Sequence, residues 1–439
     1  MQTIEQRCAA VGIQIPDIWL PAAGTDLNQW AVIACDQHTS NPEYWRHVEQ
    51  IVAGAPSTLS LIFPEVYLGA RDRADRITRI AEAMRRYERE GILSNCGPMA
   101  VLVQRSTPHV PVRTGLVVAL DLERYDFRPD STSLIRATEG TILDRLPPRV
   151  EVRRQVSFEL PHVLVLIDDP DTTVIEPLAT DRDDLECIYE ADLMLGGGSV
   201  RGYAVNDETR LGRIADALAA LAEPGRLKAR YGRDDAMLFA VGDGNHSLAT
   251  AKQVWEERKA KGAPDDDPAR YALVELINMH DPGLHVEPIH RVVSGISFEE
   301  LAAVVTQAGG SPGARVAPTD AAVAIPAGAG SQFALISDAA ALLFETGGSA
   351  EQAPAVLVQN LLENLERERP GTIEVDYIHG TEAILSLCAQ PGRSGFLVPA
   401  IRAETLFGFV ANHGPLPRKI FSLGEAEEKR YYLEARKIV

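Results

Sequence analysis

The chain has 439 residues, enough for about two or three domains, and its 45% apolar and 24% charged residues are an ordinary globular composition. Its 62 acidic residues outnumber 43 Lys and Arg residues and give a formal net charge of −19. This charge argues against a general binder of nucleic acid or of anionic membranes, because neutralising phosphates requires a basic field, although a small local basic pocket remains compatible with it.

The first half of the chain predicts alternating helices and strands. Apolar residues recur at helical spacing over residues 42–53 and 71–90, which indicates two amphipathic helices. Short apolar runs bounded by turn residues predict strands. The expected strands of this half are residues 30–35, 99–104, 115–122, 162–168 and 199–205.

The middle of the chain continues this alternation. A long helical pattern over residues 207–230 is interrupted at Pro224-Gly225. An apolar strand at 236–241 then runs into a glycine-rich turn, and a helix is expected over residues 247–261. Another strand is expected at 271–279.

From about residue 300 the composition changes, and Ala, Gly and Pro dominate up to about residue 355. A strand pair at 333–336 and 341–344 and a β-α-β pattern between 372 and 398 predict a small α+β fold here. We therefore expect a main α/β domain at residues 1–295 and a smaller C-terminal α+β subdomain with a tail at 296–439. The predicted class is α/β to α+β, with mixed sheets and flanking helices.

The cysteine pattern and the apolar segments of the chain indicate the cellular compartment. The five cysteines are scattered and include no C-x-x-C pair, which fits a reducing compartment rather than a disulfide framework or a zinc site. The N-terminus lacks a long apolar stretch, and no run of about 18 apolar residues occurs that could span a membrane. We expect a cytoplasmic protein that takes a small-molecule substrate and contacts neither membrane nor nucleic acid.

The best candidate for a chemical centre is the turn Gly242-Asp243-Gly244-Asn245-His246-Ser247. It lies between a buried strand and a helix, so the free N–H groups and positive end of that helix suit an anion such as phosphate. Asp243 can bind a metal ion or a hydroxyl or act as a base, and His246 can donate to a phosphate or move a proton. In the competing structural interpretation, Asp243 or Asn245 caps the helix and His246 is a packed residue.

Further charged residues are candidates for the same centre. Arg136, Glu139, Arg145 and Arg149 lie within fourteen residues; the arginines can clamp phosphate or carboxylate groups, and Glu139 can accept a proton. A solvated charged segment is the alternative. Asp168-Asp169 can hold Mg²⁺ or form a strand-end turn, and His290-Arg291 can contact an anionic ligand or be buried.

Several ordered segments of the chain resemble those of the bacterial and archaeal family called domain of unknown function 1015. The glycine turn is similar to the family's D-G-x-H-R segment. The other matching segments are Arg136-Ala-Thr-Glu139-Gly-Thr141, Asn278-Met-His-Asp281-Pro282-Gly283 followed by His290-Arg291, Asp376-Tyr377-Ile378-His379-Gly380, and Trp30 to Gln37 followed by Pro42-Glu43-Tyr44-Trp45.

The D-G-x-H-R turn also resembles that of the ParB and sulfiredoxin-like superfamily, whose members bind nucleotide phosphates at this helix start and include free-serine kinases. The resemblance implies a ParB/sulfiredoxin-like core. The chain departs from the pattern at Ser247, which replaces the expected Arg, so a direct Arg–phosphate contact is lost there and another arginine or a different ligand must compensate.

The leading hypothesis is a nucleotide-dependent phosphotransferase that acts on a small hydroxylated metabolite, with ATP or another nucleotide and Mg²⁺ as cofactors. A non-catalytic sensor of an anionic ligand is the alternative, and the sequence leaves a homo-oligomer open. The expected catalytic residues are Asp243, His246 and Glu139. Asp243 is also the expected metal ligand. The expected nucleotide-binding residues are Gly242, Gly244, Asn245, Ser247, Arg136, Arg149 and Arg291.

Overall fold

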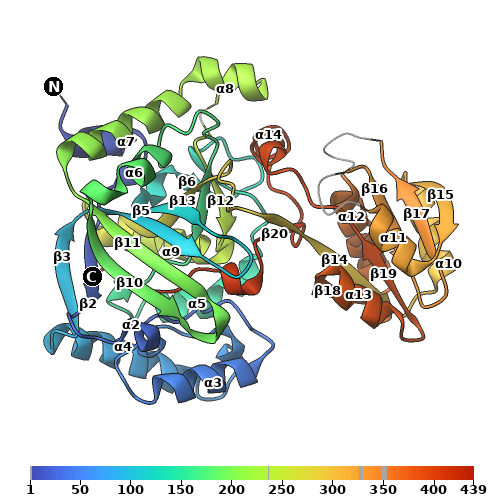
Figure 1. Ribbon diagram of the computed structural model, residues 1–439, viewed down its shortest axis with the longest axis horizontal. Coiled ribbons are helices and arrows are strands. Elements are labelled where there is room, and N and C mark those ends of the chain that lie inside the picture. The colour runs from blue at the N-terminus through green and yellow to red at the C-terminus, as the bar shows by residue number, and fades with distance from the viewer. Residues whose placement is uncertain (1, 236, 326–329, 348–352) are drawn as a thin grey trace. The chain divides into compact units, whose positions relative to one another are not determined.

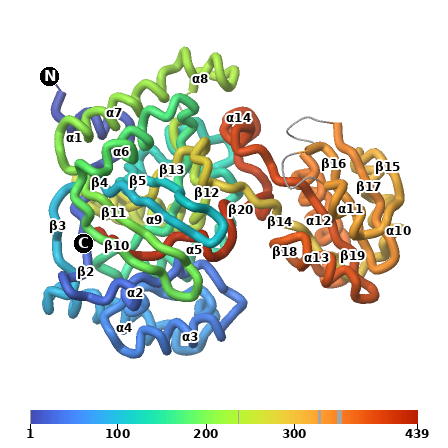
Figure 2. The backbone as a smooth tube through the Cα atoms, in the orientation of Figure 1, coloured from blue at the N-terminus to red at the C-terminus, as the bar shows by residue number. Residues whose placement is uncertain are grey.

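The computed structural model describes residues 2–235, 237–325, 330–347 and 353–439, so Ala236, the expected first residue of one strand, lies outside them. The chain forms two compact units. Unit 1 comprises Met1–Leu284 and Ala426–Val439, and unit 2 comprises His285–Glu425. Figures 1 and 2 trace the chain through both.

Unit 1 is built on a mixed sheet, antiparallel from its first strand to its fifth and with both parallel and antiparallel neighbours beyond (Figure 1). In spatial order its strands are β10 (Glu186–Leu193), β11 (Gly198–Val205), β4 (Ala100–Ser106), β5 (Arg113–Asp121), β13 (Tyr271–Asn278), β9 (Leu164–Ile167), β12 (Phe239–Asp243), β7 (Ile135–Ala137) and β6 (Tyr125–Asp126), with β1 (Ile13–Gln14) paired to β5. Two small ladders join β2 (Asp17–Pro21) to β3 (Leu93–Pro98) and β8 (Phe158–Glu159) to β21 (Arg436–Lys437).

Both faces of this sheet are buried, which explains why its central strands are continuous apolar runs. In β5, Leu116 and Val118 belong to the core on one face, while Val117 belongs to the core on the other. This alternation follows from the two-residue period of a strand. Strands covered on both sides need apolar residues at every position, so the sequence predicts β4, β5, β9, β11 and β13 correctly.

Helices cover both faces. They are α1 (Ile4–Ala10), α2 (Leu27–Trp30), α3 (Pro42–Val52), α4 (Arg73–Arg89), α5 (Leu146–Arg153), α6 (Glu176–Thr180), α7 (Glu208–Leu221), α8 (Pro224–Tyr231) and α9 (Asn245–Ala260). Pro224 begins a new helix because it fits the first helical turn but not a helix interior, which confirms the predicted break.

The last residues of the chain run through the core of unit 1. The side chains of Tyr432 and Glu434 are almost fully buried. Figure 2 shows the C-terminal end returning to the side of β2. Residues 30–35, expected to be a strand, form the end of α2 and an extended segment with a single bridge between Ile33 and Tyr431. That prediction was wrong because the run is apolar to pack against the tail, not to join the main sheet.

Unit 2 is a smaller α+β fold with its own sheet. The strand order is β15 (Ser311–Val316), β17 (Ala341–Glu345), β16 (Gln332–Ile336), β19 (Arg393–Leu397), β14 (Val286–Ser294) and β18 (Glu374–His379), with β20 (Phe421–Leu423) paired to β14. Its helices are α10 (Phe298–Gln307), α11 (Pro318–Ala324), α12 (Pro354–Glu368), α13 (Thr381–Cys388) and α14 (Ala403–His413). The expected 333–344 strand pair and the β18-α13-β19 pattern are confirmed.

The predicted class, mixed sheets with flanking helices, is confirmed. The division between units lies at Leu284–His285 rather than at residues 295–296, because β14 starts the second sheet. The tail from Ala426 also differs from the expected assignment, since it packs in unit 1. Within the described ranges, no helix is both long and apolar enough to cross a membrane.

Candidate functional site

The glycine turn joins β12 directly to α9. Gly244 is the N-cap of α9 and has a left-handed backbone, with φ of 80°. A Cβ atom at this position would lie 3.0 Å from the side chain of Val163, so both the dihedral angle and the packing require glycine. Neither Asp243 nor Asn245 caps the helix, because no side chain makes the N-cap hydrogen bond. The first N–H groups of α9 therefore lack that partner.

Asp243 is held by two donors. Its Oδ1 accepts the N–H of Gly244 at 2.8 Å, and its Oδ2 lies 2.9 Å from Nζ of Lys429 in the C-terminal tail. Burial alone raises the pKa of this carboxyl, but the Lys429 ammonium and the Gly244 N–H outweigh burial and bring the pKa below its ordinary value. Asp243 is thus a stable carboxylate and a weak base.

Asn245 and His246 make different contacts. The side chain of Asn245 is 9% exposed, and its Oδ1 is buried without a hydrogen-bond partner among the described residues. His246 Nε2 accepts the N–H of Ile142 at 3.3 Å. An orphaned buried amide oxygen is costly unless a ligand or water completes it. Oδ1 of Asn245 therefore requires a hydrogen-bond donor from a water molecule or a ligand.

The loop that follows β7 packs on the turn. Because β7 runs parallel to β12, its carboxyl end lies at the same edge of the sheet. Thr138 Oγ1 donates to the carbonyl oxygen of Val241 at 2.5 Å, and Ile142 contacts His246 as described. This loop carries Glu139, which is half-buried. The structure therefore brings the segment of Glu139 to the turn.

Ser247 belongs to a chain of hydrogen bonds. Its Oγ lies 2.6 Å from Nε2 of His162, and Nδ1 of His162 lies 2.8 Å from the hydroxyl oxygen of Tyr432. The backbone N–H of Cys35 donates to the same hydroxyl oxygen at 3.0 Å. Oδ2 of Asp36 is 3.9 Å from Nε2 of His162. The imidazole is thus fixed from both sides, as a proton-transfer group needs to be.

A cavity of about 140 Å³ lies beside this chain. Of the turn, whose residues are all described, only Ser247 lines it. Its polar and charged lining residues are Glu65, Arg149, Arg153, Glu159, His162, Ser247, Thr250 and Tyr432. Apolar side chains of residues 61–68, α4 and α5 form much of the rest. The cavity is therefore small, polar on one wall and apolar on the other.

Arg149 is the predicted arginine that reaches this cavity. Its Nε donates to Oε1 of Glu65 at 2.6 Å, and a second guanidinium nitrogen contacts Oε2 of Glu65. Burial raises the pKa of the Glu65 carboxyl, and the contact with Arg149 only partly offsets this. Arg149 is thus oriented towards the cavity by an ion pair that is itself half-buried.

Two other predicted arginines are engaged elsewhere. Arg136 is 3% exposed and donates to the carbonyl oxygen of Ser133 and to Asp235, a residue that precedes β12. Its guanidinium is therefore at the far end of β12 from the turn. Arg291 lies in unit 2, where it is fully buried and bonded to Gln359 and to the carbonyl oxygen of Lys419. Arg136 therefore lies away from the turn within unit 1, and Arg291 is engaged within its own unit.

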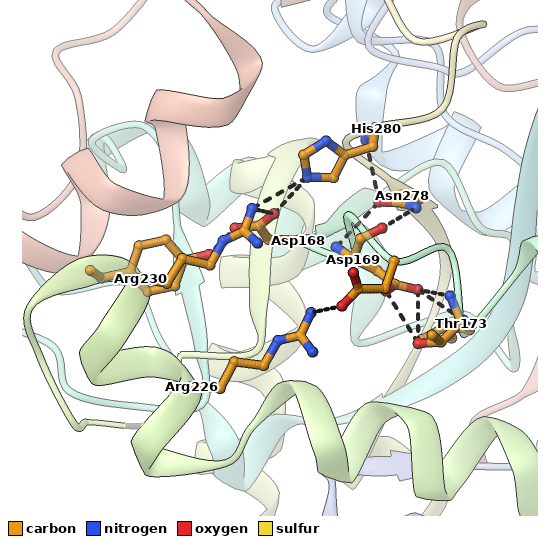
Figure 3. A network of polar contacts seen from close by, with 10 residues as sticks. Asp168, Asp169, Thr173, Arg226, Arg230, Asn278 and His280 are labelled. Carbon is orange, nitrogen blue, oxygen red and sulfur yellow. Dashed lines mark hydrogen bonds and ion pairs between the residues drawn. The ribbon is translucent and has the colours of Figure 1, made fainter.

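The second acidic pair, Asp168-Asp169, forms a separate polar network at the other end of β9 (Figure 3). Asp168 accepts from Arg230, Tyr231 and His280. Asp169 accepts from Thr173 and Val174, and Asn278 closes the network at the end of β13. Donors occupy both carboxylates, so this is the strand-end turn rather than a Mg²⁺ site. Nowhere in the described ranges do three His, Cys, Asp or Glu residues meet in a metal-binding group.

Sequence reasoning missed Lys429, His162, Tyr432 and Glu65, which complete the site. The one sequence signal for these residues was the pair Tyr431-Tyr432 in the charged tail. Two adjacent aromatic residues indicate that this part of the tail is buried rather than solvated. Nothing local to His162 marks it, since its partners are distant in sequence.

Comparison with known proteins places the chain in a family. A family model described as a protein of unknown function, DUF1015, matches residues 19–359. No curated protein matches the chain.

Three solved structures show low similarity. A free serine kinase in complex with AMP is 13% identical over 73% of this chain and 92% of that one, with a TM-score of 0.40. A conserved hypothetical protein from Pyrococcus furiosus is 14% identical over 72% and 90%, with a TM-score of 0.36. SbnI with a C-terminal truncation, from Staphylococcus aureus, is 10% identical over 70% and 82%, with a TM-score of 0.36. The ParB-like resemblance stays a prediction, whereas the family model spans most of the chain, which belongs to the DUF1015 family.

Proposed function

We propose that this protein is a nucleotide-dependent phosphotransferase that acts on a small hydroxylated metabolite, with the nucleotide phosphates held at the start of α9. The observation that carries the proposal is the state of that helix start. A 16-residue helix begins at a glycine N-cap without a side-chain cap. Beside it the buried Oδ1 of Asn245 lacks a donor, which a hydroxyl or amino group of a ligand would supply. Free N–H groups and the helix dipole favour an anion there.

The cavity beside Ser247 suits the acceptor rather than the nucleotide. Pockets for drug-sized ligands measure roughly 300–1,000 Å³. The cavity of about 140 Å³ is smaller than this range and fits a small metabolite. The paired Glu65 and Arg149 form a charged part of the cavity wall, and Ser247 and Thr250 provide hydroxyl groups.

His162 is the best placed base for the acceptor hydroxyl. In the tautomer with its proton on Nδ1, that proton is donated to Tyr432, and Nε2 is left to accept. In the transfer, the acceptor oxygen bonds to the terminal phosphorus while the bond from that phosphorus to the bridging oxygen breaks. The nucleoside diphosphate leaves with the electron pair, and Nε2 takes the hydroxyl proton.

Asp243, Glu139 and His246 then have supporting roles. Asp243 is a poor base because Lys429 lowers its pKa, and we assign it to holding the turn. Glu139 belongs to the 138–142 loop, and His246 contacts this loop through the N–H of Ile142. Asp243 is not suited to act as a dedicated Mg²⁺ ligand, because both of its carboxylate oxygens already accept hydrogen bonds.

The proposal is tested in two steps. Thermal unfolding with ATP, ADP and CTP at millimolar concentration should show a raised midpoint, since a ligand of the folded state stabilises it. Transfer of the terminal phosphate to a panel of hydroxylated metabolites should then occur in wild type and fail in His162→Gln. No shift with any nucleotide would overturn the proposal. A shift without transfer to any acceptor would favour a non-catalytic sensor of an anionic ligand.

A further inference from the structure

A second cavity in unit 1 has a strongly basic lining. It measures about 620 Å³ and lies between α4, residue Glu49 of α3 and residues 59–67. Five arginines line it, against two carboxylates, Glu49 and Glu82. The arginines are Arg76, Arg79, Arg85, Arg86 and Arg89. We call it the arginine groove. On a chain with a net charge of −19, such a local excess of cations needs a specific explanation.

Neighbouring carboxylates neutralise these arginines only in part: Arg76 donates to Asp72 at 2.9 Å, and Arg89 lies 3.4 Å from Glu90. Among the described residues, Arg85 and Arg86 have no ion-pair partner within 4.0 Å. Arg79 is 63% exposed and reaches Asp72 only at 3.7 Å. Ion pairs this exposed contribute little, so these guanidinium groups remain available to a ligand. Arginine is the side chain best suited to phosphate and carboxylate groups.

The rest of the groove has a different chemistry. Leu59, Ile62, Phe63 and Ile80 supply apolar side chains, and the ring of Tyr67 has the guanidinium carbon of Arg76 only 3.9 Å from its centroid. The volume is within the roughly 300–1,000 Å³ of small-molecule sites and far larger than one phosphate. A ligand that fills the groove therefore needs an apolar or ring portion as well as anionic groups.

We propose that the arginine groove binds a phosphorylated organic molecule of nucleotide size, with its phosphates on the α4 arginines and its ring or apolar part on the residue 59–67 wall. Nucleic acid is the less fitting occupant. The groove is local, and the surrounding chain is acidic and repels an extended polyanion.

The position of the groove connects it with the proposed active site. Ile62 and Phe63 line both the arginine groove and the cavity beside Ser247. Glu65, in the same segment, holds Arg149 at that cavity. The two cavities therefore share this segment, and we expect a groove ligand that holds it to change the affinity of the second cavity for the acceptor. This second part of the inference rests on the proposed function, whereas the binding itself does not.

Binding is tested on the full chain by calorimetric titration with 1-naphthyl phosphate, with 1-naphthol and inorganic phosphate as partial probes. The test variant is Arg79→Glu/Arg86→Glu. The matched control is Arg213→Glu/Lys228→Glu, which makes the same charge change at exposed positions of α7 and α8. We expect 1-naphthyl phosphate to bind more tightly than either partial probe, and the groove variant to lose at least tenfold in affinity while the control keeps it.

Two results would overturn the binding proposal. One is equal affinity of the groove variant and wild type for 1-naphthyl phosphate. The other is binding through these arginines of phosphatidylglycerol vesicles or a single-stranded oligonucleotide, with no measurable binding of 1-naphthyl phosphate. Failure of the phosphotransfer assay alone would remove the proposed function and leave the groove site intact. Retained binding in Asn245→Leu would show that the groove is separate from the α9 start.

Discussion

Nζ of Lys429 lies 2.9 Å from Oδ2 of Asp243, although 186 positions of the chain separate the two residues. The C-terminal tail thus supplies the cation that pairs with the aspartate of the glycine turn. The next residue, Arg430, is buried and paired with Glu275 and Glu434, which fixes the tail in the core of unit 1. The geometry of the candidate site therefore depends on a segment that no local motif connects to it.

Removing Lys429 should destabilise the protein in a pH-dependent way. In Lys429→Met the Asp243 carboxylate loses its cationic partner, and we expect the free energy of unfolding to fall by about 2–3 kcal/mol. The loss is smaller than for a fully buried pair because the side chain of Asp243 is 26% exposed. In wild type the pKa of Asp243 is lowered, so its stabilisation is present above its ordinary pKa and lost as the pH falls through the folded value. In the variant, burial dominates and raises the pKa.

The deficit of the Lys429 variant should therefore shrink on acidification, which urea denaturation at pH 7.5 and pH 5 would measure. Lys437→Met is the control, since Lys437 and Glu88 form a more exposed pair and its loss should cost under about 1 kcal/mol. A deficit that grows on acidification would contradict the assignment.

Replacing His162 should separate binding from turnover. In His162→Gln we expect kcat to fall about 10²–10⁴-fold, the usual contribution of a general base, with the nucleotide-induced thermal shift unchanged. Tyr432→Phe removes only the hydroxyl at Nδ1 and should lower kcat less. Steady-state kinetics on the two variants would decide; a wild-type kcat in His162→Gln would exclude this residue as the base.

Gly244 should tolerate no side chain. Gly244→Ala places a Cβ against Val163 at a left-handed dihedral, which we expect to cost about 2–3 kcal/mol in strain and overlap. Gly262, just after α9, has φ of 88° and open space around it, so Gly262→Ala should cost only the dihedral strain, about 1 kcal/mol. Equal losses in denaturation midpoints would show that the Val163 contact is unimportant.

The Asp168 network should be structural. Asp168→Asn removes the charge that Arg230, Tyr231 and His280 share, and we expect a loss of about 2 kcal/mol without any change in nucleotide-induced stabilisation. Asp171→Asn disrupts an exposed pair with Arg226 and should be nearly neutral. Loss of nucleotide binding in Asp168→Asn would instead place this network in the functional site.

The sequence by itself determined the local elements and the candidate turn. Apolar periodicity located α4 and β5, Pro224 located the helix break, and the glycines flanking Asp243 marked the strand-to-helix turn. These signals are local, because the apolar periodicity of an element and the backbone dihedral angles open to glycine or proline depend on only a few neighbouring residues. Family membership was likewise readable from ordered motifs.

Only the tertiary structure decided which side chains meet at the turn. Strand β9 runs antiparallel to β12, so Asp168 and Asp243 lie at opposite ends of the sheet, whereas β7 runs parallel and brings the Glu139 loop to the turn. The path of the tail brings Tyr432 to His162 and Lys429 to Asp243. Strand direction and long-range packing are properties of the whole chain, and no pattern within a short window encodes them.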